Sequence, residues 1–294
     1  MSPNAVSPDA VSAVLDAVTA LFVPGDRPDR FAKAVAAGAD VVIIDLEDAV
    51  SPDRRPYALD QASAALSGAD PARPTPRALV RVTDASSSTH REEVDRLVDL
   101  ARRPGHGLIG VVVPKATDAG ALAQVVTAFE AGTAPVPVVA LVESAAGILA
   151  APALARTPGV ARLAFGALDF SLDVGADPDS ETTRSARTQL VLASRAAGLP
   201  GPFASPSVEI ADLAAVETAA RRAHSDGFGG QLCIHPSQVE VVRKAFLPTE
   251  QEKRWAEGVL TATKDGASRR EGQMIDRPVL ERARRIRRQL DGRS

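Results

Sequence analysis

Eight short apolar segments, separated by stretches with helical spacing, restrict the fold of this chain more than any other feature. Most are rich in Val, Leu and Ile without polar alternation, as is typical of strands buried on both faces. Between them, stretches such as Asp118–Ala131 and Ile210–Ser225 carry apolar residues at helical spacing. The eight segments are Leu21–Val23, Val41–Asp45, Leu79–Val82, Leu108–Val113, Val138–Val142, Leu163–Phe165, Pro202–Ala204 and Gln231–Ile234. Eight strands alternating with helices predict an α/β fold, a parallel (β/α)8 TIM barrel, with an open doubly wound sheet as the alternative.

The chain is expected to divide into three segments. Residues 1–20 form an N-terminal arm and a short helix, residues 21–247 the barrel, and residues 248–294 a helical C-terminal extension. In the extension, a polar loop at Lys264–Gln273 precedes a very basic helix at Asp276–Leu290. Because the extension is longer than barrel closure requires, we expect it to serve as a lid or a subunit-exchange element.

The composition excludes several kinds of partner. The 294 residues include 34 basic and 37 acidic side chains and only 3% aromatic residues, so nucleic acid is not an expected partner. Hydrophobic residues make up 45% of the chain without the continuous apolar run of a membrane span. Cys233 is the one cysteine, and the first residues lack the basic segment of a signal peptide. A cytoplasmic protein with no membrane partner is therefore expected.

Acidic and basic side chains gather where the predicted strands end, which is the edge of such a barrel that carries active sites. Glu143 and Asp169 end adjacent strands, so their carboxylates are expected within reach of one cation. Two carboxylates without a matching set of His or Cys favour Mg²⁺ over Zn²⁺. The alternative is helix capping, by Ser144 or by a carboxylate that directly follows a strand.

Several motifs, taken together, resemble one known family. The segment Leu21–Val50 is similar to the signature of the HpcH/HpaI aldolase and citrate lyase β-subunit superfamily. The resemblance continues in order through VRVT, VVVPKATDAGAL, LVESAAGIL, FGALDFSLDVGAD, GFGGQLCIHPSQVEVV and GQMIDRPVLERARRI. The MID-containing tail favours the CoA-ester lyase branch, which includes malyl-CoA and citramalyl-CoA lyases. The resemblance implies a Mg²⁺-dependent lyase that cleaves or forms a 3-hydroxyacyl-CoA, such as malyl-, citramalyl- or citryl-CoA, with an acyl-CoA and a 2-oxo acid as products.

The resemblance also implies roles for residues near the metal. Glu143 and Asp169 match the acids that hold Mg²⁺, which polarises the 2-oxo acid. Arg81 matches an arginine that neutralises the enolate oxygen of the acyl fragment, whereas a surface arginine paired with an acid is the alternative. Glu47 and Asp48 match acids that line the site and order water near the metal, and Asp48 is a secondary candidate for proton handling.

Other matches concern the substrate. Phe22, Arg27 and Lys33 match positions that contact CoA, with the two cations meeting its phosphates, although Lys33 also fits an ordinary exposed helix residue. The remaining residues expected to bind substrate lie at the ends of the sixth and eighth strands and are Ala167, Ile234 and His235.

Asp276 matches an aspartate that the lyases deliver from the C-terminal segment of a neighbouring subunit for proton transfer. A homo-oligomer, most often a trimer, is therefore implied. From the residue alone, an N-cap of the last helix is the alternative, and one residue can do both.

Some positions depart from the family pattern and leave the cleaved acid open. These are Thr83 in place of a common asparagine, Arg55 in place of a lysine, and the segment Gly198–Pro206, which lacks a common aspartate. Two other functions also stay open. One is the β subunit of a multi-subunit citrate lyase acting on an acyl-carrier-protein thioester, and the other is a non-catalytic barrel that binds acyl-CoA or a keto acid.

Overall fold

The computed structural model describes residues 8–68, 75–131, 136–264, 269–270 and 273–291. The chain forms two compact units, Met1–Val242 and Arg243–Ser294. The division lies within helix α10 (Pro236–Ala245), whereas the sequence suggests an extension that begins at residue 248. Within the described ranges, no helix is both long and apolar enough to cross a bilayer.

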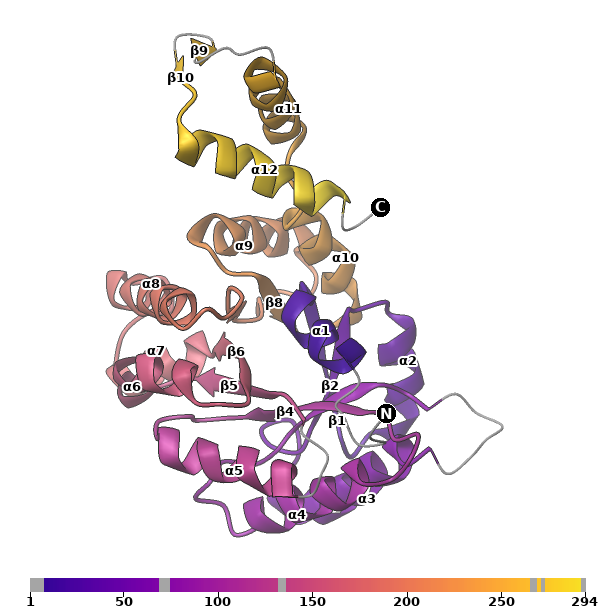
Figure 1. Ribbon diagram of the computed structural model, residues 1–294. Helices are drawn as coiled ribbons and strands as arrows, with labels where there is room; N and C mark the ends of the chain where they lie inside the picture. Colours follow the sequence, from indigo (N-terminus) through magenta and orange to yellow (C-terminus); the bar gives the residue numbers. More distant parts are fainter. Residues whose placement is uncertain (1–7, 69–74, 132–135, 265–268, 271–272, 292–294) are drawn as a thin grey trace. The chain divides into compact units, whose positions relative to one another are not determined.

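The first unit is the expected closed barrel of parallel strands (Figure 1). Its strands follow one another in chain order around the barrel, and β1 pairs with β8 to close it. The strands are β1 (Thr19–Pro24), β2 (Val41–Asp45), β3 (Ala78–Arg81), β4 (Leu108–Val113), β5 (Val138–Val142), β6 (Val160–Phe165), β7 (Phe203–Ala204) and β8 (Gly230–Cys233). An open doubly wound sheet is thus excluded.

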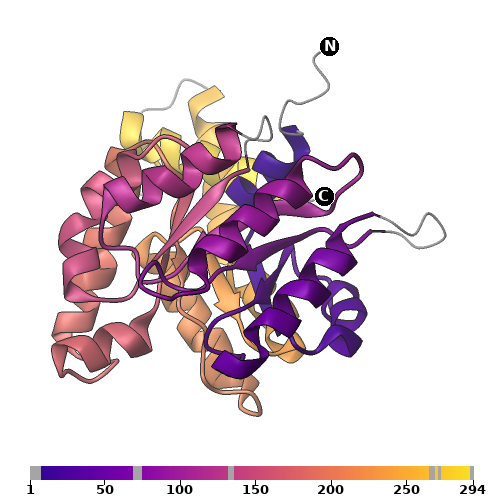
Figure 2. The ribbon, with the colours of Figure 1, turned by 90° about the horizontal axis from the view of Figure 1, so that it is seen from below.

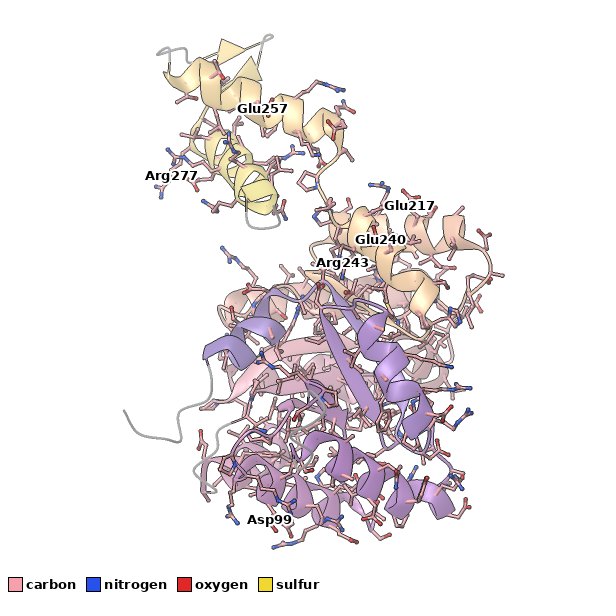
Figure 3. All side chains as sticks on the ribbon, turned by 90° about the vertical axis from the view of Figure 1, so that its right-hand side faces the viewer. Asp99, Glu217, Glu240, Arg243, Glu257 and Arg277 are labelled. Carbon is pink, nitrogen blue, oxygen red and sulfur yellow. The ribbon has the colours of Figure 1, made fainter. Side chains whose placement is uncertain are left out.

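Helices cover the outside of the strands (Figures 1 and 2). They are α2 (Phe31–Ala36), α3 (Arg55–Leu66), α4 (His90–Ala101), α5 (Ala119–Ala131), α6 (Ala145–Arg156), α7 (Ala167–Val174), α8 (Glu181–Ala196) and α9 (Leu213–Asp226), with short 3₁₀ helices at Pro28–Arg30 and Pro52–Arg54. On these outer helices, charged side chains such as Asp99 and Glu217 point away from the barrel (Figure 3). The alternation of buried strands and amphipathic helices therefore has the pattern expected from the sequence.

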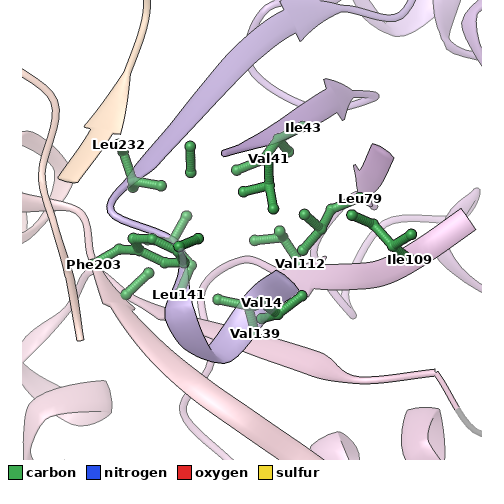
Figure 4. Close-up of a cluster of buried hydrophobic side chains, with 13 residues drawn as sticks. Val14, Val41, Ile43, Leu79, Ile109, Val112, Val139, Leu141, Phe203 and Leu232 are labelled. Atoms are coloured by element: carbon green, nitrogen blue, oxygen red, sulfur yellow. The ribbon is translucent and has the colours of Figure 1, made fainter. Parts of the chain in front are cut away.

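The interior of the barrel is filled by apolar side chains from successive strands (Figure 4). Ile43, Leu79, Leu141 and Phe203 are all buried in one cluster there. Helix α1 (Pro8–Asp16) adds Val14 to the same cluster and contacts β4 and β6. The barrel interior is thus a packed core, which leaves only the strand ends for a site.

Arg162, near the start of β6, is fully buried beside the end of α1. Its Nη1 donates to the carbonyl oxygens of Val14 at 3.1 Å and Ala17 at 2.6 Å, and its Nε donates to Gly201 O at 2.8 Å. Its guanidinium also lies 3.6 Å from the ring centroid of Phe203. Burial lowers the pKa of Arg162 to about 9. The hydrogen bonds of Arg162 to Val14 and Ala17 therefore attach the end of α1 to the barrel.

The second unit consists of two helices and a small hairpin. Helices α11 (Glu250–Lys264) and α12 (Arg277–Asp291) pack through a cluster that includes Ala256, Val259, Ala283 and Ile286. Strands β9 (Arg269–Arg270) and β10 (Gln273–Met274) pair antiparallel. The prediction of a loop at Lys264–Gln273 was therefore wrong for its paired residues, because two-residue strands leave no periodic signal. Lys264 is the last residue of α11, and residues 265–268 and 271–272 lie outside the described residues.

Candidate active site

A cavity of about 590 Å³ opens at the C-terminal ends of the barrel strands. Each strand except β4 contributes lining residues from its end or the loop after it, and α8 and α9 contribute others. Seven of the residues predicted from the sequence line it, namely Phe22, Asp48, Arg81, Glu143, Ala167, Asp169 and Ile234. The structure therefore brings together side chains that lie up to about two hundred positions apart in the chain.

Arg81 is the central cation of this cavity. Its Nε and Nη2 donate to the two carboxylate oxygens of Asp45, both at 2.7 Å, and its Nη1 donates to Asp48 at 3.1 Å. Burial opposes its charge, but the hydrogen bonds and charges of the acids, with Asp45 first, raise the pKa of Arg81 above its ordinary value. The guanidinium also lies 4.8 Å from the ring centroid of Phe22. Arg81 is thus paired with acids, as in the alternative interpretation, but at a buried position in the cavity wall.

Glu47 is buried beside Arg81, with 1% of its surface exposed. Its Oε1 accepts a hydrogen bond from Lys115 Nζ at 2.9 Å. Its Oε2 lies 3.1 Å from Arg81 Nη1 but forms no hydrogen bond in the described part of the chain. Burial, followed by the charge of Asp48, raises the pKa of Glu47 against the opposing effects of Arg81 and Lys115. Glu47 is not among the residues that line the cavity, and its Oε2 is enclosed beside Arg81.

Glu143 follows β5 and is 4% exposed. Its Oε1 accepts from the backbone N–H of Lys115 at 2.7 Å. Its Oε2 lies beside Gly166, where a Cβ atom would be only 2.7 Å away. Burial raises the pKa of Glu143 to about 8, and the charges of Glu47 and Asp169 act in the same direction. The glycine therefore leaves the space that the Glu143 carboxylate occupies.

Asp169 lies in the first turn of α7 and lines the same cavity as Glu143. The capping alternative does not account for Glu143, because α6 is capped by other side chains. Ser144 Oγ accepts from Gly147 N at 3.1 Å, and Asp173 accepts from Ala145 N at 2.7 Å. The Glu143 carboxylate instead faces the cavity.

These residues fit a hard divalent cation. Five carboxylates line the cavity, those of Asp45, Asp48, Glu143, Asp169 and Asp179, together with two cations, Arg81 and Arg187. Among the described residues, no group of three or more His, Cys, Asp or Glu side chains is arranged to hold a metal. Mg²⁺ commonly uses only one or two carboxylates together with water and substrate oxygens. The oxygen-only donors and the excess negative charge therefore suit Mg²⁺ better than Zn²⁺.

Three residues predicted to bind substrate are not among the residues that line the cavity. Arg27 is exposed and pairs with Asp29 at 3.1 Å. Lys33 is exposed on α2, and His235 is exposed with its Nδ1 2.7 Å from Ser237 Oγ. Their roles in CoA or substrate binding stay predictions.

Asp276 belongs to the second unit and forms the N-cap of α12. Its Oδ1 accepts from Val279 N at 3.0 Å, and its carbonyl oxygen accepts from Leu280 N at 3.0 Å. The capping interpretation is thus observed, whereas the proton-transfer role stays a prediction.

The sequence assigned no role to three residues that support the side chains around the cavity. Lys115 contacts both Glu47 and Glu143, and its place at a strand end was a usable signal. Ser205 Oγ accepts from Ala167 N and donates to Phe165 O, both at 2.8 Å. Gln238 is buried and connects the residues after β8 to the loop after β7 through Ser207 O and Glu209 O. Nothing in the local sequence identifies the last two.

Comparison with known proteins agrees with this site. Residues 19–236 match the HpcH/HpaI aldolase/citrate lyase family, and the chain belongs to it. This family takes its name from aldolases and citrate lyases, which are carbon–carbon lyases.

Individual relatives cover nearly the whole chain. A citrate lyase subunit beta-like protein from Mycobacterium tuberculosis is 37% identical over 276 residues, which cover 90% of this chain and 92% of that protein. The L-malyl-CoA/beta-methylmalyl-CoA lyase of Cereibacter sphaeroides is 29% identical and covers 92% of this chain and 93% of its own. The crystal structure of CitE from M. tuberculosis, in complex with magnesium, acetoacetate and coenzyme A, is similar with a TM-score of 0.78 and 32% identity, covering 94% of this chain and 98% of that one.

Proposed function

We propose that this protein is a Mg²⁺-dependent carbon–carbon lyase acting on a 3-hydroxyacyl-CoA thioester, with an acyl-CoA and a 2-oxo acid as products. The observation that carries the proposal is the placement of Glu143, Asp169 and Arg81 around one cavity at the strand ends. The CitE complex with magnesium and coenzyme A and the named activity of the malyl-CoA lyase support it. Malyl-, citramalyl- and citryl-CoA are the candidate substrates.

The carboxylates of Glu143 and Asp169 would hold the ion. When bound, Mg²⁺ supplies Lewis-acid stabilisation of charge on the oxygens of the 2-oxo acid. Arg81 would supply the complementary stabilisation of an enolate oxygen through the second N–H of Nη2, because Nε and the first Nη2 N–H bond Asp45, and Nη1 lies beside Asp48 and Glu47. In this proposal Glu47 helps to order water near the metal, and Asp48, which lines the cavity, is a secondary candidate for moving a proton.

The remaining contacts complete the proposed substrate site. Phe22, Ala167 and Ile234 border the acyl chain and the 2-oxo acid, and His235 shapes the mouth. The cations expected to meet the CoA phosphates are Arg27 and Lys33, and Arg27 would exchange Asp29 for a phosphate.

The C-terminal segment, residues 248–294, completes the site in this proposal as a lid or subunit-exchange element. Asp276 from a neighbouring subunit transfers a proton to or from the acyl fragment. This arrangement requires a homo-oligomer, and a trimer in the cytoplasm is the proposed form.

A screen of 3-hydroxyacyl-CoA thioesters with Mg²⁺, in which the released 2-oxo acid is detected, tests the proposal. The panel includes acyl-carrier-protein thioesters, because a citrate lyase subunit beta of Leuconostoc mesenteroides is 28% identical over 91% of this chain. Turnover of carrier-bound substrate alone supports the citrate lyase subunit function. Tight binding of a thioester without turnover supports the non-catalytic barrel.

A further inference from the structure

Lys115 has an unusual backbone conformation beside the cavity. It follows β4 and Pro114 and has φ of 48°, a positive value that no other non-glycine residue shows in the described ranges. The left-handed conformation is unfavourable for a residue with a Cβ atom. Such conformations persist where surrounding contacts compensate, and they occur often at functional sites. The contacts of Lys115 therefore indicate what the conformation achieves.

The backbone N–H of Lys115 bonds to a side chain, that of Glu143, instead of to the neighbouring strand. The chain pairs with β5 up to Val113, and the N–H of Ala116 again donates to Leu141 O at 3.0 Å. Between these two points, Pro114 has no N–H, and the N–H of Lys115 donates to Glu143 Oε1. This bond orients the carboxylate so that its other oxygen, Oε2, lies against Gly166.

The side chain of Lys115 contacts a second carboxylate. Its Nζ lies 2.9 Å from Glu47 Oε1, with 48% of the Lys115 side chain exposed and only 2% of that of Glu47. The opposite oxygen of Glu47 is the one that faces Arg81. One residue thus contacts the candidate metal ligand through its backbone and the neighbouring acid through its ammonium group.

We propose that Lys115 is a positioning residue whose backbone N–H fixes Glu143 and whose ammonium group fixes Glu47. The proposal rests on the proposed function for its kinetic consequences, but the placement of the two carboxylates is independent of the substrate. Because the two contacts use different groups, substitution of the side chain separates them.

Three variants of Lys115, a control and one double variant test this assignment. Lys115→Met removes the ammonium group and keeps the N–H, Lys115→Arg keeps the charge, and Lys115→Gly also relieves the positive φ. Arg96→Met is the matched control, because Arg96 forms a 2.7 Å ion pair with Asp60, is 42% exposed and is not among the residues lining the cavity.

In Lys115→Met, kcat is expected to fall about 10- to 100-fold, the usual effect of losing an outer-shell partner, with KM and the Mg²⁺ dissociation constant changed less than about threefold. Lys115→Arg recovers most of kcat. Lys115→Gly loses kcat like Lys115→Met while its melting temperature stays the same or rises. Combining Lys115→Met with Glu47→Gln adds little further loss, because both disrupt the same contact.

A parent-like kcat in Lys115→Met, or a melting temperature that falls in parallel with kcat in Lys115→Met and Lys115→Gly, overturns the assignment. Calorimetry with Mg²⁺ and crystal structures of the parent and Lys115→Met need no turnover. If the parent protein cleaves no thioester, the proposed function fails. The positioning role is still supported if the crystal structure of Lys115→Met shows the Glu47 side chain displaced and Glu143 in its original place. An unmoved Glu47 contradicts it.

Discussion

At the scale of single residues, Glu143 is the group on which the proposed metal site depends most. Its carboxylate is buried and faces the cavity, so Glu143→Gln removes a charged ligand without changing its size. Mg²⁺ binding measured by calorimetry should weaken by more than the roughly 10- to 100-fold that loss of an outer-shell partner costs. Asp169→Asn should weaken it as well.

Asp173→Asn is the matched control for that experiment. Asp173 caps α6 and is not among the residues that line the cavity, and asparagine caps a helix about as well as aspartate. Parent-like Mg²⁺ binding and turnover in both Glu143→Gln and Asp169→Asn would remove these residues from the metal site.

The raised pKa of Glu143 makes Mg²⁺ binding depend on pH. With a pKa of about 8 in the metal-free protein, Glu143 is protonated at pH 6 and must lose that proton to bind the ion. The apparent Mg²⁺ affinity should therefore rise by up to about tenfold per pH unit below pH 8 and level off above it. The effect of pH on folding has the opposite sign. Between about pH 4.5 and 8, Glu143 keeps its proton in the folded state but loses it in the unfolded chain. The free energy of unfolding of the metal-free protein therefore falls as pH rises through this range.

Calorimetric titrations at several pH values, in buffers with different ionisation enthalpies, measure the proton released. Glu143→Gln removes this proton release and serves as the control. An Mg²⁺ affinity that is independent of pH between 6 and 8 in the parent would contradict the assignment.

The sequence predicts which side chains reach the cavity better than it predicts what they contact. Glu143, Asp169 and Arg81 follow from strand ends, because parallel strands place their C-terminal ends on one edge. The pairing of Arg81 with Asp45 and the two contacts of Lys115 depend on side-chain rotamers and on one positive φ value. Spacing along the chain does not determine these.

At the scale of secondary structure elements, the junction between β6 and α7 controls the space around Glu143. A methyl group at position 166 would lie 2.7 Å from Glu143 Oε2, so Gly166→Ala should displace that carboxylate. Although φ of −102° suits alanine, the methyl group would also lie 2.8 Å from Glu143 Cβ, so the melting temperature should fall as well. Turnover should fall about 10- to 100-fold, as expected for a misplaced reacting group. Kinetics and thermal unfolding of the same preparation test this, and unchanged turnover would show that the junction tolerates the added carbon.

A second prediction at this scale concerns the attachment of α1. Arg162→Met leaves two buried carbonyl oxygens and one partly buried carbonyl oxygen without their donor, and each buried loss costs about 1–3 kcal/mol. The free energy of unfolding, measured with denaturant, should fall by about 3 kcal/mol or more. Arg156→Met removes a bond from an exposed arginine to Pro152 O and should change stability by less than about 0.5 kcal/mol. Equal effects of the two changes would contradict the anchoring role of Arg162.

Helices and strands were predicted well where their apolar residues repeat with a clear period. The buried strands and helix α5 were found within a few residues, because their apolar residues repeat in the pattern that burial requires. Strand β7 has only two residues and gave a weak signal, and the hairpin of β9 and β10 gave none. Short pairings depend on the partner strand more than on their own residues.

At the scale of the whole molecule, Asp276 connects the C-terminal unit to the proposed chemistry. Asp276→Asn should leave folding, assembly and Mg²⁺ binding nearly intact, because asparagine also caps a helix well. Turnover should nevertheless fall roughly 100-fold or more, the scale of a lost acid–base group. Mixing this variant with Arg81→Ala and exchanging subunits should restore part of the activity if each site uses two chains.

Light scattering and the activity of the mixture check that prediction. Asp276→Glu, which keeps the carboxylate, is the matched variant and should retain more activity than Asp276→Asn. A monomer in solution, or full activity in Asp276→Asn, would leave Asp276 as a helix cap only.

The five carboxylates and two cations at the cavity also have a consequence for the order of events. A 2-oxo acid is an anion, and the cavity is negatively charged until a divalent cation enters, so the acid meets repulsion in the metal-free protein. Cation and acid must then bind with positive cooperativity, each increasing the affinity of the other by the same factor. The protein is therefore expected to bind the acid weakly by itself and to bind it well only after the divalent cation.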